Sequence, residues 1–308
     1  MVQKTLNLHP AKSIAPAVDA HYLWQIFQLA TNPLEFFDIY AAKYGDCFTA
    51  KMGRSVDLAF FSHPEAIAEI FTAPPESFVV GPANEPMRPI LGDTSLLLLD
   101  GQVHRQHRQL LMPPFHGDRL KGYGHAMTRI AQATTSHWVS GSYCDLFEEL
   151  REISLRIILK TVFGLDQEEQ IVAFRDLLDG IWSVSAPWIR FAQTYLPGVK
   201  WDWGDWTPAG RLLRLRQQID QVIYATITER QQSQIETPDI LNLLLSAKDE
   251  SGSGLTQEEI RDELITLLLA GRDSVAAALS WMMLLVHTNS SVLETLVEEV
   301  RALGVDPD

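Results

Sequence analysis

Apolar residues recur at helical spacing through most of the chain, and this pattern predicts a mainly α-helical protein. The longest such stretch runs from Gln257 to Val286, and Thr256 precedes Glu259 by three residues, as in a capping box. At about 1.5 Å per residue this helix would be about 45 Å long, roughly a domain diameter. It is apolar on nearly every side, which indicates burial in protein or in lipid.

The remaining pattern predicts shorter helices and one hairpin. Two strand-like runs, Cys47 to Met52 and Val56 to Phe61, flank Gly53 and Arg54, and Cys47 is expected in the core. Proline and glycine predict an irregular loop over 73–94, the kind of loop that often forms a lid or a binding loop. Helices are expected over 34–44, 120–138, 146–163, 211–231 and 290–303. No stretch resembles a linker, so we expect one mainly α domain over residues 1–308 with a small β-hairpin region.

The pentapeptide 270–274, Ala-Gly-Arg-Asp-Ser, interrupts the long apolar helix. A glycine in mid-helix costs about 1 kcal/mol relative to alanine, so something should compensate for it. Ala270, Asp273 and Ser274 share a face by their spacing, which predicts a flat surface beside a carboxylate and a hydroxyl. Ser274 could also bond back to the Ala270 carbonyl. A helix-packing notch with a buried Arg272–Asp273 pair is the alternative.

A second informative stretch places His104 and Arg108 one helical turn apart, ahead of Pro114 and Phe115. Two donors that converge on one point would suit an anion such as a carboxylate. A solvated basic face is the alternative interpretation. Beside them, Arg105, His107, Arg119 and Lys121 make the neighbourhood locally basic, which could steer an acidic partner.

Charge and cysteine content narrow the function classes. A formal net charge of −14 argues against nucleic acid as a partner. The presence of only two cysteines, Cys47 and Cys144, argues against a disulfide framework and suits a reducing cytoplasm. No signal peptide is expected at the N-terminus. We also expect no transmembrane segment, because Arg272 and Asp273 stand near the centre of the longest apolar stretch.

The pentapeptide resembles the central helix of the cytochromes P450, whose pattern reads Ala/Gly-Gly-x-Asp/Glu-Thr. His104-x-x-x-Arg108 with the following Pro-x-Phe, and the order of predicted elements, resemble the same family. The resemblance implies a P450-like helical fold and assigns roles to individual residues. Ala270 and Gly271 would lie over a haem, Ser274 would steady bound oxygen, and Asp273 would deliver protons. His104 and Arg108 would bind a haem propionate, and Thr266, Leu269 and Ala270 would face the substrate.

The function that this resemblance implies is a monooxygenase with haem b and its iron, using O₂. Electrons would come from NAD(P)H through a ferredoxin- or flavin-type reductase. The apolar substrate would be a fatty acid, alkane or terpenoid, as in bacterial, cyanobacterial-like soluble members.

The later part of the family signature is absent from this sequence. No Glu-x-x-Arg follows the central helix, and neither Cys47 nor Cys144 stands in a haem-ligating loop. We therefore expect an N-terminal portion of a P450, incomplete at the C-terminus after the helix that follows the oxygen-site helix. By itself such a chain would be inactive and poorly soluble. The alternative is a non-enzymatic helical binding protein for a hydrophobic ligand.

Overall fold

The computed structural model of the chain describes residues 15–53, 56–184, 204–233, 237–248 and 252–304. The chain divides into two compact units, residues 1–78 with 183–211 and residues 79–182 with 212–308. Each unit contains its own cluster of buried apolar side chains. The prolines, glycines and tryptophans of residues 196–210 predict a loop that either acts as a lid over substrate or anchors itself to its own core; residues 196–203 of it lie outside the described residues.

The smaller unit contains the predicted hairpin. Its elements are α1 (Tyr22–Thr31), α2 (Pro33–Tyr44), β1 (Cys47–Lys51), β2 (Asp57–Phe61), α3 (Pro64–Thr72) and the 3-10 turn Pro75–Ser77. The strands pair antiparallel, with Thr49 opposite Ala59. Phe36, Tyr40 and Phe48 form the centre of its aromatic core. The hairpin is confirmed, whereas Cys47 is only half-buried and is not a core residue.

The larger unit is helical among the residues that the structure describes. It begins with short turns, α4 (Gly81–Asn84), η2 (Glu85–Met87) and α5 (Arg88–Leu91), so the segment predicted as an irregular loop is partly helical. The longer helices are α6 (Gly101–Leu111), α7 (Asp118–Thr135), α8 (Leu146–Phe163), most of α9 (Glu168–Val184), most of α11 (Pro208–Ser233), α12 (Ile240–Ser246), α13 (Gln257–Thr288) and α14 (Ser290–Leu303). The 3-10 turn η3 (Pro113–Phe115) follows α6. The predicted fold class, mainly α with a small β-hairpin, is confirmed.

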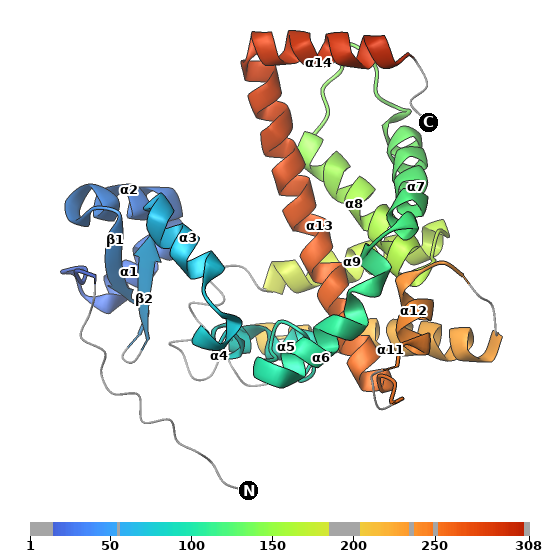
Figure 1. Cartoon of the computed structure of the whole chain (residues 1–308), viewed down its shortest axis with the longest axis horizontal. Helices are drawn as coiled ribbons and strands as arrows, with labels where there is room; N and C mark the ends of the chain where they lie inside the picture. The colour runs from blue at the N-terminus through green and yellow to red at the C-terminus, as the bar shows by residue number, and fades with distance from the viewer. Residues whose placement is uncertain (1–14, 54–55, 185–203, 234–236, 249–251, 305–308) are drawn as a thin grey trace, which may run out of the picture. The chain divides into compact units, whose positions relative to one another are not determined.

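Helix α13 organises this unit, as its sequence predicts. The Thr256 hydroxyl accepts from the Glu259 N–H while the Glu259 carboxylate accepts from the Thr256 N–H, so the predicted capping box is present. Helix α8 packs along α13 (Figure 1). Helix α8 ends at Gly164, which adopts the left-handed conformation that commonly closes a helix. Leu155, Leu264 and Leu268 lie in the core between the two helices.

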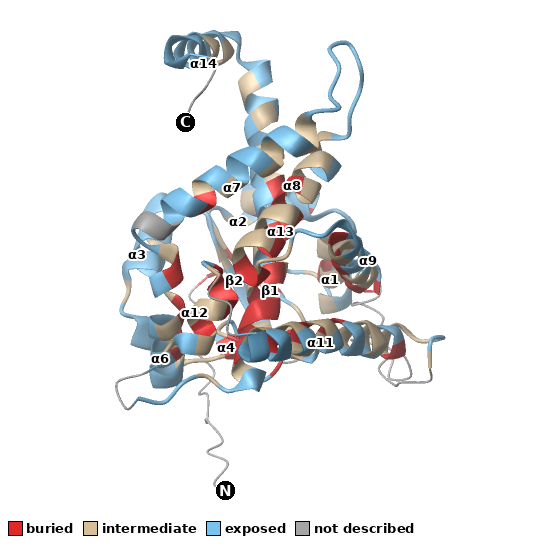
Figure 2. Ribbon diagram, turned by 90° about the vertical axis from the view of Figure 1, so that its right-hand side faces the viewer, coloured by how far each residue is buried: buried red, intermediate tan, exposed pale blue. Residues whose placement is uncertain are grey.

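The C-terminal half of α13 differs from the expectation of burial. Trp281 is 64% exposed and Leu285 is 58% exposed, and α14, expected to turn Leu296 and Val300 inward, has no buried residue (Figure 2). By length and composition α13 could span a membrane, yet its most apolar 18-residue window is only 11% buried. Nothing among the described residues covers this apolar surface. The prediction from apolar spacing that these side chains are buried is therefore wrong for the described part of the chain.

Candidate functional site

Ala270 and Ser274 lie on an exposed side of α13, one turn apart. The Ser274 hydroxyl donates to the Ala270 carbonyl at 2.5 Å, which confirms the predicted back-bond. Both side chains are small, so this side of the helix presents a low surface with one hydroxyl. Asp273, expected on the same face, is instead turned towards α8.

Helix α8 holds the other side of the pentapeptide through three residues on successive turns. Arg151 Nε donates to Asp273 Oδ1 at 2.7 Å, and the buried Ser154 hydroxyl donates to the Gly271 carbonyl at 2.8 Å. A Cβ on Gly271 would stand 2.8 Å from Ile158 Cδ1. Gly271 is therefore needed for the close approach of α8, and neither Arg151 nor Ser154 was singled out from sequence.

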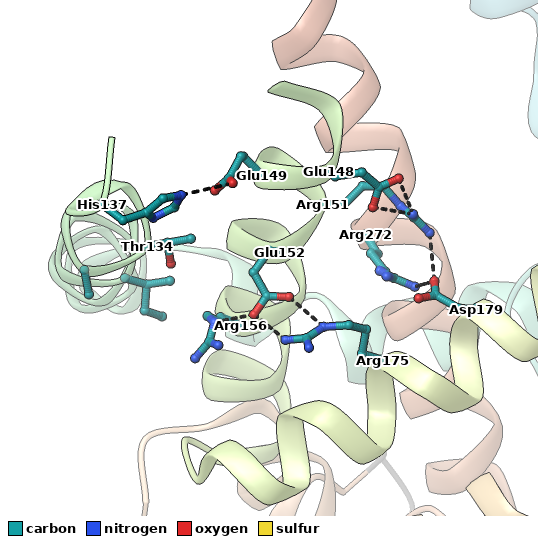
Figure 3. A pocket seen from close by; sticks show the side chains of 12 residues that line it. Thr134, His137, Glu148, Glu149, Arg151, Glu152, Arg156, Arg175, Asp179 and Arg272 are labelled. Carbon is teal, nitrogen blue, oxygen red and sulfur yellow. Dashed lines mark hydrogen bonds and ion pairs between the residues drawn. The ribbon is translucent and has the colours of Figure 1, made fainter. Parts of the chain in front are cut away.

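A polar cavity of about 630 Å³ lies beside this contact, between α7, α8, α9 and α13 (Figure 3). Asp179 accepts from Arg151 at 3.0 Å and from the buried Arg272 at 2.9 Å. The predicted alternative, a buried pair of Arg272 with Asp273, is therefore wrong, because each of the two residues pairs with a different helix. The other arginines that line the cavity, Arg156 and Arg175, both pair with Glu152, so the cavity has little free positive charge.

His104 is half-buried and Arg108 is exposed, one turn apart on α6. Neither side chain has a hydrogen bond or ion pair with any residue that the structure describes. Most other arginines of this unit are held by carboxylates. These two donors therefore remain available for an anionic group.

His107, expected to add to a basic surface, is buried and contributes no surface charge. Its Nδ1 lies 3.2 Å from Glu263 Oε1, and its Nε2 lies 3.5 Å from Glu259 Oε1. The hydrogen bond with Glu263 raises the pKa of the His107 imidazole, and burial raises the pKa of the Glu263 carboxyl. This cluster fastens α6 to α13 one residue before Arg108.

A second buried polar cluster fastens the segment before α6 to the same part of α13. Arg261 donates to Asp220, to Asp262 and to the carbonyls of Ile90 and Leu91. Asp262 in turn accepts from the backbone and the hydroxyl of Thr94. These contacts fix the chain on both sides of Gly92 against α13.

The structure thus divides the predicted site residues into two groups. Ala270, Gly271, Asp273 and Ser274 come from one turn of α13, and His104 and Arg108 come from one turn of α6. Glu263, where the two helices are joined, is about 10 Å along the axis from Ala270. Of the predicted substrate residues, Thr266 is buried and shares a 2.7 Å hydrogen bond with Ser95, Leu269 is half-buried, and Ala270 is exposed.

Comparison with known proteins identifies relatives across nearly the whole chain. A family model described as cytochrome P450 matches residues 16–305. Cytochrome P450 135B1 of Mycobacterium bovis is 33% identical over 282 residues, covering 90% of this chain and 57% of that protein. Cytochrome P450 138 of the same species is 31% identical over 295 residues, covering 94% of this chain and 65% of that protein.

Two solved structures share the fold. Retinoic acid-bound cyanobacterial CYP120A1 aligns with a TM-score of 0.75 at 22% identity, covering 95% of this chain and 64% of that one. The haem domain of cytochrome P450DA aligns with a TM-score of 0.79 at 21% identity, covering 96% and 65%. The chain thus spans less than two thirds of the length of each of these four proteins.

Proposed function

Because the chain belongs to the cytochrome P450 family, we propose that it provides the oxygen side and the propionate-binding helix of a haem-dependent monooxygenase. The observation that carries the proposal is the open side of α13, where Ala270 and Ser274 stand beside a glycine. An uncovered surface of small residues in the middle of a long core helix suits a flat ligand that lies against it.

The residues present fit haem in a second respect. His104 and Arg108 are donors without a protein partner among the described residues, and paired donors at this spacing suit a carboxylate. His107 holds their helix against α13 through Glu259 and Glu263, so their positions are fixed by buried contacts. When bound, haem iron supplies the oxygen activation that amino-acid side chains do not provide.

Ser274 and Asp273 would handle protons at this site. The Ser274 hydroxyl uses its hydrogen on the Ala270 carbonyl, which leaves its oxygen able to accept another hydrogen bond at the open side. Asp273 is held at Oδ1 by Arg151, and this ion pair would have to break before the carboxylate could turn towards Ser274. We assign Asp273 the task of carrying protons from the polar cavity.

Substrate and partners follow as part of the same proposal. Leu269 and Ala270 would face an apolar substrate such as a fatty acid, alkane or terpenoid, and retinoic acid, bound in the cyanobacterial relative by fold, is a suitable probe. Electrons would reach the site from NAD(P)H through a ferredoxin- or flavin-type reductase. We propose a soluble cytoplasmic protein with a single P450-like domain.

The iron ligand is the part of the site that we do not assign to this chain. Cys47 lies in β1 of the smaller unit and Cys144 is exposed ahead of α8. Because the match covers 57% of the first relative, we propose that the thiolate comes from the part of the family sequence beyond it. The 308 residues alone would then be inactive.

The test is the carbon-monoxide difference spectrum of the reduced protein, recorded for the 308-residue chain and for a chain extended through the genomic reading frame. We expect a thiolate-type Soret band from the extended chain only. Arg108→Ala should weaken haem retention, whereas Arg301→Ala, at an exposed position on α14, should not. A thiolate band from the 308 residues would make Cys47 or Cys144 the ligand. No haem signal from either chain would favour a hydrophobic-ligand binding protein.

A further inference from the structure

Two consecutive carbonyls of α13 each receive a hydroxyl hydrogen bond. Ala270 accepts from Ser274 of its own helix at 2.5 Å, and Gly271 accepts from Ser154 of α8 at 2.8 Å. In a regular α-helix the same carbonyls already accept from the N–H groups of residues 274 and 275. A hydroxyl that shares such a carbonyl weakens the helical bond and loosens that turn.

The two hydroxyls have different consequences when the turn opens. Ser274 belongs to the turn and moves with it, whereas Ser154 is 5% exposed and is anchored in α8 between the core residues Ile153 and Leu155. If the Val275 N–H leaves the Gly271 carbonyl, Ser154 remains as a donor to that half-buried group. Without any donor, this half-buried carbonyl would carry a larger penalty.

Neighbouring contacts indicate that the helix can open at Gly271. Gly271 has no side chain to resist a change of backbone angle, and its missing Cβ is what allows Ile158 to approach. Arg151, one turn before Ser154, holds Asp273. Helix α8 therefore binds one side of the pentapeptide 270–274, while the backbone on the open side of the pentapeptide can change conformation.

We propose that Ser154 is a positioning residue that stands in for the Val275 N–H, so that the turn at Ala270–Ser274 can open without leaving the Gly271 carbonyl unpaired. Its consequence for catalysis rests on the proposed function, because an opened turn beside Ser274 would give oxygen and water room at the haem side. The opening itself is a property of the chain without haem. It can therefore be tested separately.

The experiment is residue-resolved amide hydrogen exchange of the 308-residue chain, wild type against Ser154→Ala. Without the hydroxyl, opening leaves the Gly271 carbonyl unpaired, so exchange of the Val275 amide should slow by roughly tenfold, the factor for about one hydrogen bond. Amides of the buried half of α13, such as that of Leu268, should exchange as fast as before or faster, because the folded state has lost a contact. A slower Val275 amide beside an unchanged or faster Leu268 amide distinguishes positioning from a merely structural role, in which both amides would exchange faster.

Two further variants keep the test decisive. Ser154→Thr keeps the hydroxyl and should restore the wild-type Val275 rate, and Ser154→Cys, nearly the same size but a weak donor, should slow it even if the alanine variant does not fold. The matched control is Ser280→Ala, which removes a hydroxyl from the Ala276 carbonyl of the same helix and should leave Val275 unchanged.

The proposal is overturned if the Val275 amide is unaffected, or if it accelerates together with Leu268, in Ser154→Ala and Ser154→Cys. A missing haem signal in the extended chain would instead overturn the proposed function and leave the exchange result standing. If both proposals hold, the haem-loaded extended enzyme with Ser154→Ala should form less product per NAD(P)H consumed than the Ser154→Thr variant.

Discussion

The two halves of α13 differ in which side chains they bury. In the first half Arg261, Asp262 and Glu263 are 1%, 2% and 1% exposed, whereas in the second half Trp281 and Leu285 are more than half exposed. Three charged side chains are buried together with Leu264 and Leu268 in the first half, and large apolar side chains are exposed in the second half of the same helix. The difference teaches that the partners available to each half, and not its composition, decide its burial.

In the first half, each of the buried charges Arg261, Asp262 and Glu263 has partners. Arg261 is bound by Asp220, Asp262 and two carbonyls, and Glu263 is bound by His107. The second half presents apolar surface that nothing in the described part of the chain covers. Such a large patch is typical of an interaction surface. We propose that the family sequence beyond the match packs there, since the first relative is covered over only 57% of its length.

The largest expected effect comes from breaking the buried charge cluster. Arg261→Ala removes the cation that pairs with the buried Asp262 and the donor to the Ile90 and Leu91 carbonyls, so the free energy of unfolding should fall by about 3–5 kcal/mol. Arg301→Ala, at an exposed position on α14, should change it by less than about 0.5 kcal/mol. Urea unfolding followed by circular dichroism measures both. If both variants changed the free energy of unfolding equally, the contacts of Arg261 would contribute no net stability to the folded chain.

A matched pair of leucines sharpens the comparison without any charge. Leu268 is fully buried and Leu285 is 58% exposed, on the same helix. Leu268→Ala should cost about 2–5 kcal/mol through lost contacts and a cavity. Leu285→Ala should cost less than about 0.5 kcal/mol in the 308-residue chain. If Leu285→Ala costs as much as Leu268→Ala, the second half of α13 is covered in solution, by self-association or otherwise, and sedimentation analysis would separate these cases.

A smaller effect should follow from pH. Hydrogen bonding to Glu263 raises the pKa of His107, and burial raises the pKa of Glu263, so the folded chain binds these protons more tightly than the unfolded chain does. The stability from His107 is fully present below its ordinary pKa of about 6.5, and it is lost as pH rises through the higher folded pKa. Glu263 acts with the same sign.

His107→Gln should therefore flatten the loss of stability as pH rises above about 6.5. His125→Gln, at an exposed position on α7, serves as the control and should leave that slope unchanged. Urea midpoints at each pH give the slope. A wild-type chain that becomes more stable with rising pH in this range would contradict the assignment.

The sequence predicted those features whose signals are local. Pro33 and Gly45 bound α2, Gly164 ends α8, and Thr256 with Glu259 starts α13, each within a few residues of the boundary that it sets. The family resemblance also came from two short motifs, and the comparisons confirm it.

The remaining features depend on contacts between residues far apart in the chain. Ser154 and Gly271 are 117 positions apart, and His107 and Glu263 are 156 apart. Without the fold, His107 looked like one more basic surface residue and Ser154 like a helical serine. The apolar spacing of α14 was read correctly as helical, but spacing does not say whether a neighbour exists to cover it.

The smallest effect concerns Gly271, which lies where the two halves of α13 meet. Alanine favours a helix over glycine by about 1 kcal/mol, and Gly124→Ala on α7, where nothing lies within 4 Å of the new Cβ, should realise much of that gain. At Gly271 the Cβ would stand 2.8 Å from Ile158 Cδ1, so overpacking should offset the gain and leave Gly271→Ala about 1 kcal/mol less stable than wild type.

Ile158→Val removes that methyl group and supplies the control for this interpretation. Alone it should cost about 0.5–1.5 kcal/mol, and together with Gly271→Ala it should cost less than the sum of the two single changes. A double-variant cycle by urea unfolding measures the difference. Additive effects would mean that the new Cβ at Gly271 does not meet Ile158 and that the loss of stability in Gly271→Ala has another cause.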